Sequence, residues 1–314
     1  MNNIMNMLVT IGKNRELYHI DIMGKYPLIK LEKLNNIKLP HLFHYSSSDA
    51  VFNIIEKNQL FITNSKFLND KTEYIYMKEV LEIFLSKIKK NIDNNSTFYT
   101  FCSELINNYT DDIYFSNFKY FILSASINPD NLTLWGNYTQ GEGCNIEFNN
   151  NIEKIFCFNE PLNFISIYAN KIIYSHIEQI NMISRFFSLI YEYYKEITAS
   201  YGSSDEKSIK EVFFWDTKIL LSVCTLFFKK NEFKQEEEFR IVFVTNNNNN
   251  TKYRIKNKNI SPYIILPLQK DFLTSLCIGP KNISDITATG WSEYLTGKGY
   301  NHVTVNVSNI PLRY

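Results

Sequence analysis

The segment Glu236–Arg240 places two carboxylates and one guanidinium at alternate positions of the sequence Glu-Glu-Glu-Phe-Arg. If this segment is a strand, side-chain alternation puts Glu236, Glu238 and Arg240 on one face. Neighbouring carboxylates raise each other's pKa, whereas a guanidinium favours their charged form. A carboxylate tuned in this way suits a hydrogen bond to a substrate on which charge develops. The alternative is a solvent-exposed strand edge whose ion pair contributes little to stability.

Two further sets of polar residues are each weak evidence for a functional site when taken alone. His44, Tyr45 and Ser46 stand where a strand meets a helix, and Ser46 fits the cap of that helix. Ser124 ends an apolar run, and Tyr138 follows a strong Asn-Pro-Asp turn. These residues can supply hydroxyls and an aromatic wall to a cleft, or they can be ordinary packing residues.

The elements that would position these residues follow from hydrophobic periodicity and turn residues. We expect strands at Leu42–Tyr45, Leu60–Thr63, Phe118–Ser126, Cys144–Phe148, Glu236–Thr245, Lys252–Ile255, Tyr263–Leu268, Leu276–Ile278 and Val303–Val307. We expect helices at Ala50–Lys57, Lys71–Lys90, Thr133–Tyr138, Ile165–Ile197, Lys207–Lys230 and Ile283–Leu295. The asparagine run Asn246–Asn250 predicts a hairpin tip. This order predicts an α+β fold with a helical insertion rather than a βαβ repeat.

Composition narrows the classes of function. The formal net charge is +1, so no global field attracts nucleic acid or an anionic membrane. The five cysteines include no CxxC pair and predict reduced thiols in a cytoplasmic protein. No cluster of histidine, cysteine and carboxylate has metal-ligand spacing, so we expect no metal.

The longest apolar run, Ile219–Phe228, is shorter than the roughly 20 residues that span a bilayer, and no signal-peptide pattern opens the chain. We therefore expect a soluble protein with no membrane contact.

The order of several short motifs resembles a widespread bacterial family, the domain-of-unknown-function family 2971. These motifs are Leu42–Ser46, Phe67–Asp70, Phe121–Ser126 with Trp135 and Tyr138, Phe228-Lys229, Glu236-x-Glu238-Phe-Arg240, Ile278–Pro280 and Ser308–Arg313. The resemblance covers about residues 40–314, although residues 163–208 match poorly and Phe239 stands where tryptophan is usual.

Members of that family look similar to the ADP-ribosyltransferase superfamily and often occur near phage-defence or toxin genes. The resemblance implies a mixed, split β-sheet core in a single domain over residues 39–314. A helical insertion at about residues 163–230 would interrupt this domain, and residues 1–38 would form an N-terminal lead-in. NAD would be the substrate, and no metal would be needed.

The resemblance also assigns roles to the candidate site residues. Glu238 would be the catalytic carboxylate, and Glu236 would help to orient the acceptor. NAD would be bound by His44, Tyr45, Ser46, Ser124, Tyr138 and Arg240, with His44 at the ribose and Ser124 or Tyr138 beside the nicotinamide. Breaking the nicotinamide–ribose bond passes through an oxocarbenium-like state, which a carboxylate at the sugar 2-hydroxyl stabilises. We therefore expect His44 and Glu238 to lie on neighbouring strands and to face one cleft.

Two main functional hypotheses remain open. The first is an NAD-dependent ADP-ribosyltransferase-like effector that modifies a nucleic-acid or protein target in antiviral defence, with an antitoxin or defence-system protein as a partner. The second is a non-catalytic binding or sensor module in which the Glu/Arg strand is structural. A nuclease ranks last, because the acidic residues form no metal-binding group.

Overall fold

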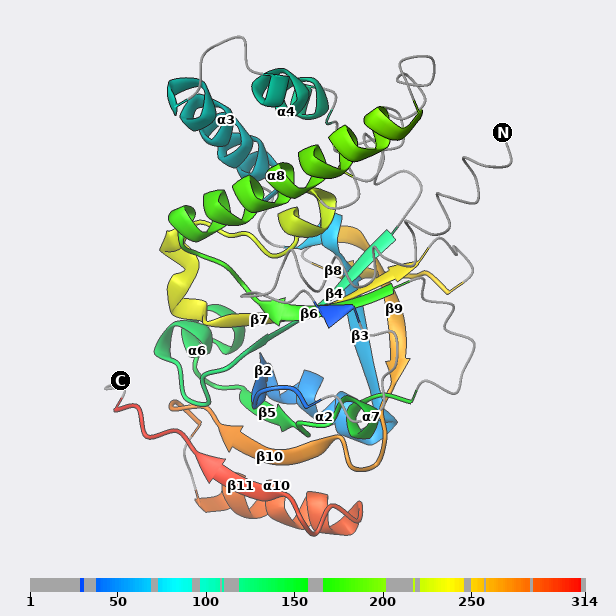
Figure 1. Ribbon diagram of the computed structural model, residues 1–314. Helices are drawn as coiled ribbons and strands as arrows, with labels where there is room; N and C mark the ends of the chain where they lie inside the picture. Colours follow the sequence, from blue (N-terminus) through cyan, green and yellow to red (C-terminus); the bar gives the residue numbers. More distant parts are fainter. Residues whose placement is uncertain are drawn as a thin grey trace. The chain divides into compact units, whose positions relative to one another are not determined.

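The described part of the chain divides into two compact units, which are treated separately (Figure 1). The computed structural model describes residues 29–30, 38–68, 73–91, 97–107, 109, 119–157, 166–201, 217, 221–245, 250–256, 258–282 and 285–311. The first unit takes its described residues from Met1–Lys30, Leu68–Lys119 and Tyr168–Glu232, and the second from Leu31–Phe67, Tyr120–Ile167 and Phe233–Tyr314.

The second unit contains most of the strands. They are β2 Leu42–Ser46, β3 Gln59–Asn64, β4 Lys119–Ser126, β5 Cys144–Phe148, β7 Glu238–Thr245, β8 Lys252–Lys256, β9 Asn259–Pro267, β10 Leu273–Ile278 and β11 Thr304–Val307. Its helical elements are α2 Ser48–Lys57, the short 3-10 helix Ser65–Phe67, α6 Leu132–Thr139, α7 Ile152–Ile155 and α10 Asp285–Gly297. Strands and helices mix along the chain, which confirms the α+β class.

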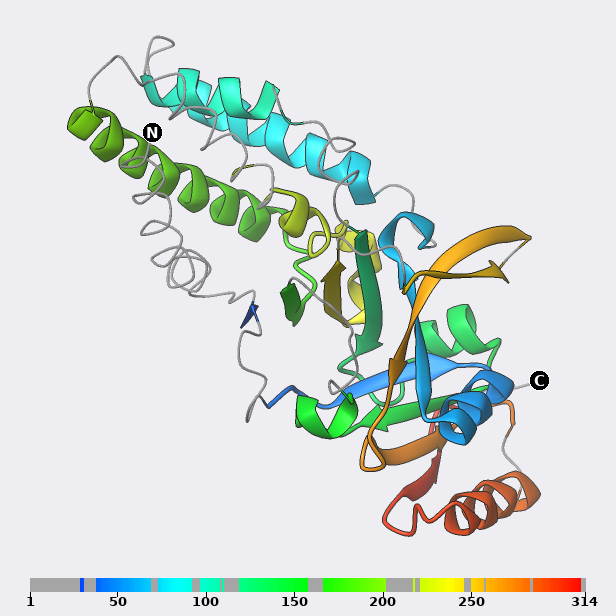
Figure 2. The same cartoon turned by 90° about the vertical axis from the view of Figure 1, so that its right-hand side faces the viewer.

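The strands of this unit form one mixed sheet that divides at β4 (Figures 1 and 2). One branch continues in the order β4-β2-β5-β10-β11, in which β10 and β11 are parallel and the other pairs are antiparallel. The other branch runs β4-β3-β9-β8, all antiparallel. Strand β4 meets β2 at Ser126 and meets β3 at Phe121 and Ile122, and β7 also lies beside β4. Strand β4 is therefore the common element of the unit.

Local sequence explains where α2 and α6 begin and end. The Ser47 side chain accepts a hydrogen bond from the Ala50 amide, and Asn58 ends α2 in the left-handed conformation, with φ 46°. Asn131 caps α6 by accepting from the Leu134 amide at 3.2 Å. Trp135 in α6 is fully buried and packs with Phe43 and with the ring of Tyr45, whose centroid lies 4.7 Å away. These contacts fix α6 on one face of β2.

The first unit is mainly helical, with α3 Glu73–Asn91, α4 Thr97–Asn107 and α8 His176–Tyr201 (Figure 1). Phe84 of α3 stacks on Phe187 of α8 with 5.1 Å between ring centroids. Tyr76 donates to the Gln179 side chain at 2.7 Å. The short strand β1 Ile29–Lys30 pairs antiparallel with Tyr168 and Ala169 of β6 Ser166–Lys171. The predicted helical insertion, as far as it is described, lies largely in this unit together with α3 and α4.

One predicted helix begins late. We expected a helix from Ile165, but Ser166–Lys171 is the strand β6, and α8 begins at His176. Ser175 accounts for this start, because its hydroxyl accepts from the Glu178 amide at 3.4 Å in the manner of an N-cap. The expected helix Lys207–Lys230 lies mostly outside the described residues and is helical at residues 217 and 221–225. Phe118, most of the asparagine run and residues 1–28 and 31–37 also lie outside them, so the lead-in boundary stays a prediction.

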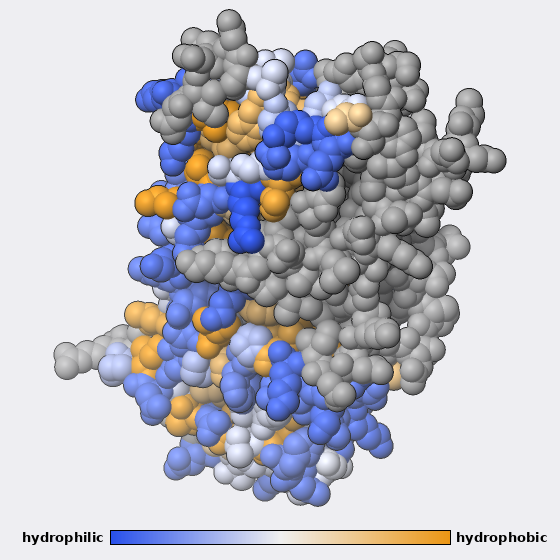
Figure 3. Space-filling view, in the orientation of Figure 1, coloured by the Kyte–Doolittle hydropathy of each residue, from blue (hydrophilic) through white to orange (hydrophobic). Residues whose placement is uncertain are grey.

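The surface in view carries hydrophilic residues interspersed with hydrophobic ones wherever the structure describes it (Figure 3). Among the described helices, none is both long and apolar enough to cross a lipid bilayer.

Candidate functional site

Glu238 and Arg240 form a buried, two-pronged ion pair at the start of β7. The Arg240 Nε donates to Glu238 Oε1 at 2.7 Å, and Nη2 donates to Oε2 at 3.1 Å. Their side chains are 8% and 2% exposed, respectively. Charge-assisted bonds of this kind are strong and directional, and the guanidinium stabilises the charged form of the carboxylate. The alternation of Glu238 and Arg240 on one strand face is confirmed, whereas the solvent-exposed alternative is wrong.

Glu236 does not share that strand face. It is the last residue of a 3-10 helix, Asn231–Glu236, and Glu237 then takes the left-handed conformation with φ 44°. Strand β7 therefore begins at Glu238, not at Glu236 as expected. The cause is tertiary: the Ser126 hydroxyl donates to the Glu236 carbonyl at 2.9 Å, and the Ile127 amide donates to the Glu237 carbonyl at 3.1 Å. These bonds divert the backbone just before the strand.

His44 is half-buried on β2, with its ring centroid 6.2 Å from that of Phe148. Its Nδ1 lies 3.2 Å from the carbonyl oxygen of Ser124 on β4 and donates to it in the tautomer that carries a proton there. This bond orients the ring between two strands of the sheet.

The expectation that His44 and Glu238 lie on neighbouring strands is wrong. Strand β4 lies between β2 and β7 in the sheet. Two strand spacings correspond to roughly 10 Å across the hydrogen-bonding direction. The two residues therefore belong to one sheet but are not in direct strand-to-strand contact.

Tyr45 is directed away from His44 and Ser46, because successive side chains of β2 alternate between faces. Its hydroxyl donates to the Asn128 carbonyl at 2.7 Å and accepts from the Asn131 amide at 3.1 Å. Burial, the largest influence, raises the pKa of this hydroxyl well above its ordinary value. Tyr45 therefore holds the turn before α6, and its hydroxyl is already engaged inside the protein.

The remaining predicted residues fall on different surfaces. Ser126 pairs with Phe43, so alternation places Ser124 on the Phe43 face of the sheet, opposite His44. Tyr138 lies on α6 and is 43% exposed. Ser46 shares the His44 face and is not the cap of α2, since Ser47 takes that role. The structure thus groups Glu238 with Arg240 and His44 with Ser46, and it separates Tyr45 and Ser124 from His44.

Asp130 is a well-bonded carboxylate that sequence reasoning treated only as part of a turn. Its Oδ1 accepts from the Trp135 indole at 2.7 Å and from the Ser308 hydroxyl at 2.7 Å, and its Oδ2 accepts from the Asn309 amide at 2.8 Å. It therefore ties α6 to the segment after β11. Nearby, Asn145 donates to the Pro129 carbonyl at 2.6 Å.

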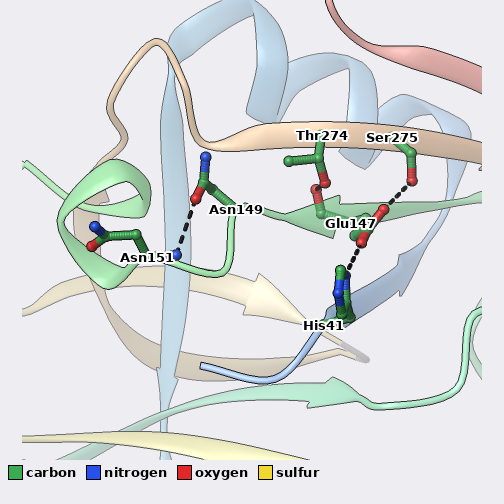
Figure 4. A network of polar contacts seen from close by, with 6 residues as sticks. All are labelled: His41, Glu147, Asn149, Asn151, Thr274 and Ser275. Carbon is green, nitrogen blue, oxygen red and sulfur yellow. Dashed lines mark hydrogen bonds and ion pairs between the residues drawn. The ribbon is translucent and has the colours of Figure 1, made fainter. Parts of the chain in front are cut away.

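A second polar network, also absent from the sequence predictions, surrounds Glu147 on β5 (Figure 4). Glu147 Oε1 lies 2.5 Å from His41 Nδ1, and Oε2 accepts from the Ser275 hydroxyl at 2.6 Å. The side chain of His41 is 72% exposed. Because the carboxylate separates the hydroxyl from the imidazole, this group lacks the direct nucleophile–base contact of hydrolases. The sequence alone does not predict this network, because Glu147 and Ser275 come together only through the pairing of β5 with β10.

No cluster of three or more histidine, cysteine or carboxylate residues suited to a metal ion occurs within the described ranges. The thiols of buried Cys144 and half-buried Cys277 are poor ligands in their neutral form, because desolvation, as the largest cause, raises their pKa values to about 11 and about 12, respectively.

Comparison with known proteins gives one match. A family model described as "Protein of unknown function (DUF2971)" matches residues 134–241, less than half of the chain. The match supports the resemblance to the domain-of-unknown-function family 2971, and its range includes Tyr138, Glu238 and Arg240 but not His44. No curated protein and no solved structure matches the chain.

Proposed function

We propose that this protein is an NAD-dependent ADP-ribosyltransferase-like effector, which acts in bacterial antiviral defence on a nucleic-acid or protein target. The observation that carries the proposal is the carboxylate of Glu238, which Arg240 holds in a buried site on β7 within the matched range. Such enzymes need one oriented, ionised carboxylate, and the sequence resemblance assigns that role to Glu238.

Glu238 would act by electrostatic stabilisation of the transition state. When the nicotinamide–ribose bond breaks, positive charge develops on the sugar, and a fixed negative charge stabilises that state. Both carboxylate oxygens of Glu238 accept from Arg240, and an ionised carboxylate can accept about four hydrogen bonds in all, so a sugar hydroxyl can add to this set of contacts. With its side chain 8% exposed, Glu238 needs a local opening before substrate reaches it.

His44 would supply the second contact. Its Nδ1 bond to the Ser124 carbonyl orients the ring, in the way that a backbone partner fixes the tautomer of many functional histidines. Its other nitrogen would then bind a ribose hydroxyl of NAD. Ser46 on the same face of β2 adds a hydroxyl. Ser124 and Tyr45 have no place in this version of the site, because alternation directs them to the opposite face.

A non-catalytic binding or sensor module is the second candidate. The same Glu238–Arg240 pair favours it, because a carboxylate with both oxygens bound and little exposure is also what a structural ion pair looks like. In that case the pair specifies the conformation of β7 and no turnover occurs.

The test is release of nicotinamide from NAD by the full-length protein, with NAD binding followed by calorimetry. Glu238→Gln keeps size and removes the charge, so it should lower the rate on the order of 10²–10³-fold. Glu293→Gln on the exposed surface of α10 is the matched control and should leave the rate unchanged. His44→Ala should weaken NAD binding. Wild-type protein that neither binds nor cleaves NAD would leave the binding module as the better account. A fully active Glu238→Gln variant would instead show that Glu238 is not the catalytic carboxylate.

A further inference from the structure

The branch β3-β9-β8 has an unusual charge composition. None of these three strands contains an aspartate or glutamate, and β8 has the sequence Lys-Tyr-Arg-Ile-Lys. The turn between β8 and β9 adds Lys258, which is exposed. A chain with net charge +1 thus concentrates cations on one small sheet. Figure 2 shows β8 beside the first part of the long, curved strand β9.

Strand pairing assigns these side chains to a common face. Lys252 pairs with Tyr263, and Tyr263 pairs with Thr63. Paired residues share a face, as do residues two apart in one strand. Lys252, Arg254, Tyr263, Thr63 and Phe61 therefore lie on the same face of the three strands.

Contacts on that face bring a cation and two aromatic rings together. The Arg254 guanidinium lies 5.1 Å from the Tyr263 ring centroid and 5.7 Å from that of Phe61. The two rings lie 4.8 Å apart, tilted by 32°. Arg254 Nη2 donates to the Thr63 hydroxyl at 3.0 Å, which fixes the guanidinium over the rings.

The face also has features that a ligand would satisfy. Phe61 is 38% exposed, although it is a large apolar residue at the middle of a sheet branch. Lys252, at the edge of this face, is exposed. If the ligand were an acidic protein surface, its carboxylates would pair with the cations of this face. The exposed Phe61 ring would then have no stacking partner.

We propose that the β3-β9-β8 face binds single-stranded nucleic acid. Phosphates would lie against Lys252 and Arg254, and an unstacked base would stack on Phe61. Stacking on aromatic side chains beside cations is the usual recognition of single strands, and it tolerates any sequence. A duplex keeps its bases stacked and offers no face to the ring. If the proposed function holds, single-stranded nucleic acid would be the class of target that the enzyme modifies. The binding itself requires neither NAD nor Glu238.

The experiment is a fluorescence titration of a labelled dodecamer of thymidine or uridine with full-length protein, without NAD, at several salt concentrations. Wild type should bind, and Phe61→Leu should weaken binding about fivefold or more, as expected for loss of one stacked base. Lys252→Ala should weaken binding and reduce the magnitude of the log–log salt slope by about 0.7, the single-strand value for one phosphate contact. Lys154→Ala, an exposed lysine on α7, is the control and should bind like wild type.

Three results would overturn the proposal: no binding at low salt, variants that bind like wild type, or equal affinity for a duplex or for polyglutamate of matched length. Melting temperatures of the variants separate lost contacts from lost folding. Because NAD is absent throughout, a failure here leaves the proposed transferase activity untouched, and a lack of NAD cleavage leaves this binding untouched.

Discussion

At the residue scale, Glu238 and Arg240 show what a short sequence pattern can and cannot establish. Strand alternation alone predicts that the two side chains meet, and they do. It does not predict burial, because a run of three glutamates suggests a solvated surface, whereas the Glu238 side chain is 8% exposed. Burial changes the energetics, since two desolvated charges depend on each other far more than a surface pair does.

Removing one member of this pair should therefore destabilise the protein. Arg240→Ala should lower the free energy of unfolding by about 3–5 kcal/mol, because it leaves the Glu238 charge buried without its partner. The double variant Glu238→Leu/Arg240→Met should recover most of that loss. Urea denaturation of wild type, Arg240→Ala and the double variant gives the three free energies of unfolding. An Arg240→Ala protein as stable as wild type would show that the pair is not buried in solution.

At the scale of elements, hydrophobic period and turn residues predicted most of the fold. Cys144–Phe148 has the expected bounds, and the strand at Leu42 extends one residue beyond them. The late start of β7 has a tertiary origin. Strand β7 begins two residues late because bonds from Ser126 and Ile127 hold the preceding backbone, and those residues are more than a hundred positions away. No local pattern contains that information.

The cap of α6 offers a test at this scale. Asn131 accepts from the Leu134 amide and donates from Nδ2 to the Gln235 carbonyl at 2.6 Å, so it joins α6 to the segment before β7. Asn131→Ala should cost about 1–2 kcal/mol of stability, in the upper range for loss of an N-cap. Asn137→Ala, an exposed position within the same helix, should be neutral or slightly stabilising. Thermal denaturation compares them, and equal effects at both positions would contradict the capping role.

At the scale of the whole molecule, the sequence predicted the class of fold but not the arrangement of its site. His44, Ser124 and Glu238 were expected to converge, and one sheet does contain their strands. Their order in that sheet depends on contacts between segments far apart in the chain, because Phe43 pairs with Ser126 and the Ile127 amide donates to the Glu237 carbonyl. Periodicity does not encode such contacts. Likewise, a net charge of +1 does not predict the cationic branch β3-β9-β8, which is apparent only from the strand pairing.

The position of β4 leads to a prediction about the stability of the second unit as a whole. Strand β4 lies beside β7, β2 and β3, and Tyr120–Leu123 are all buried, so its amides should open only with global unfolding. Strand β8 pairs only with β9 among the described strands, and its Tyr253 and Ile255 are 64% and 80% exposed. Its amides should therefore exchange far sooner than those of β4. Hydrogen–deuterium exchange followed by mass spectrometry measures both segments in one experiment. Exchange in β4 as fast as in β8 would contradict the central place of β4, and addition of a bound oligonucleotide should slow β8 while leaving β4 unchanged.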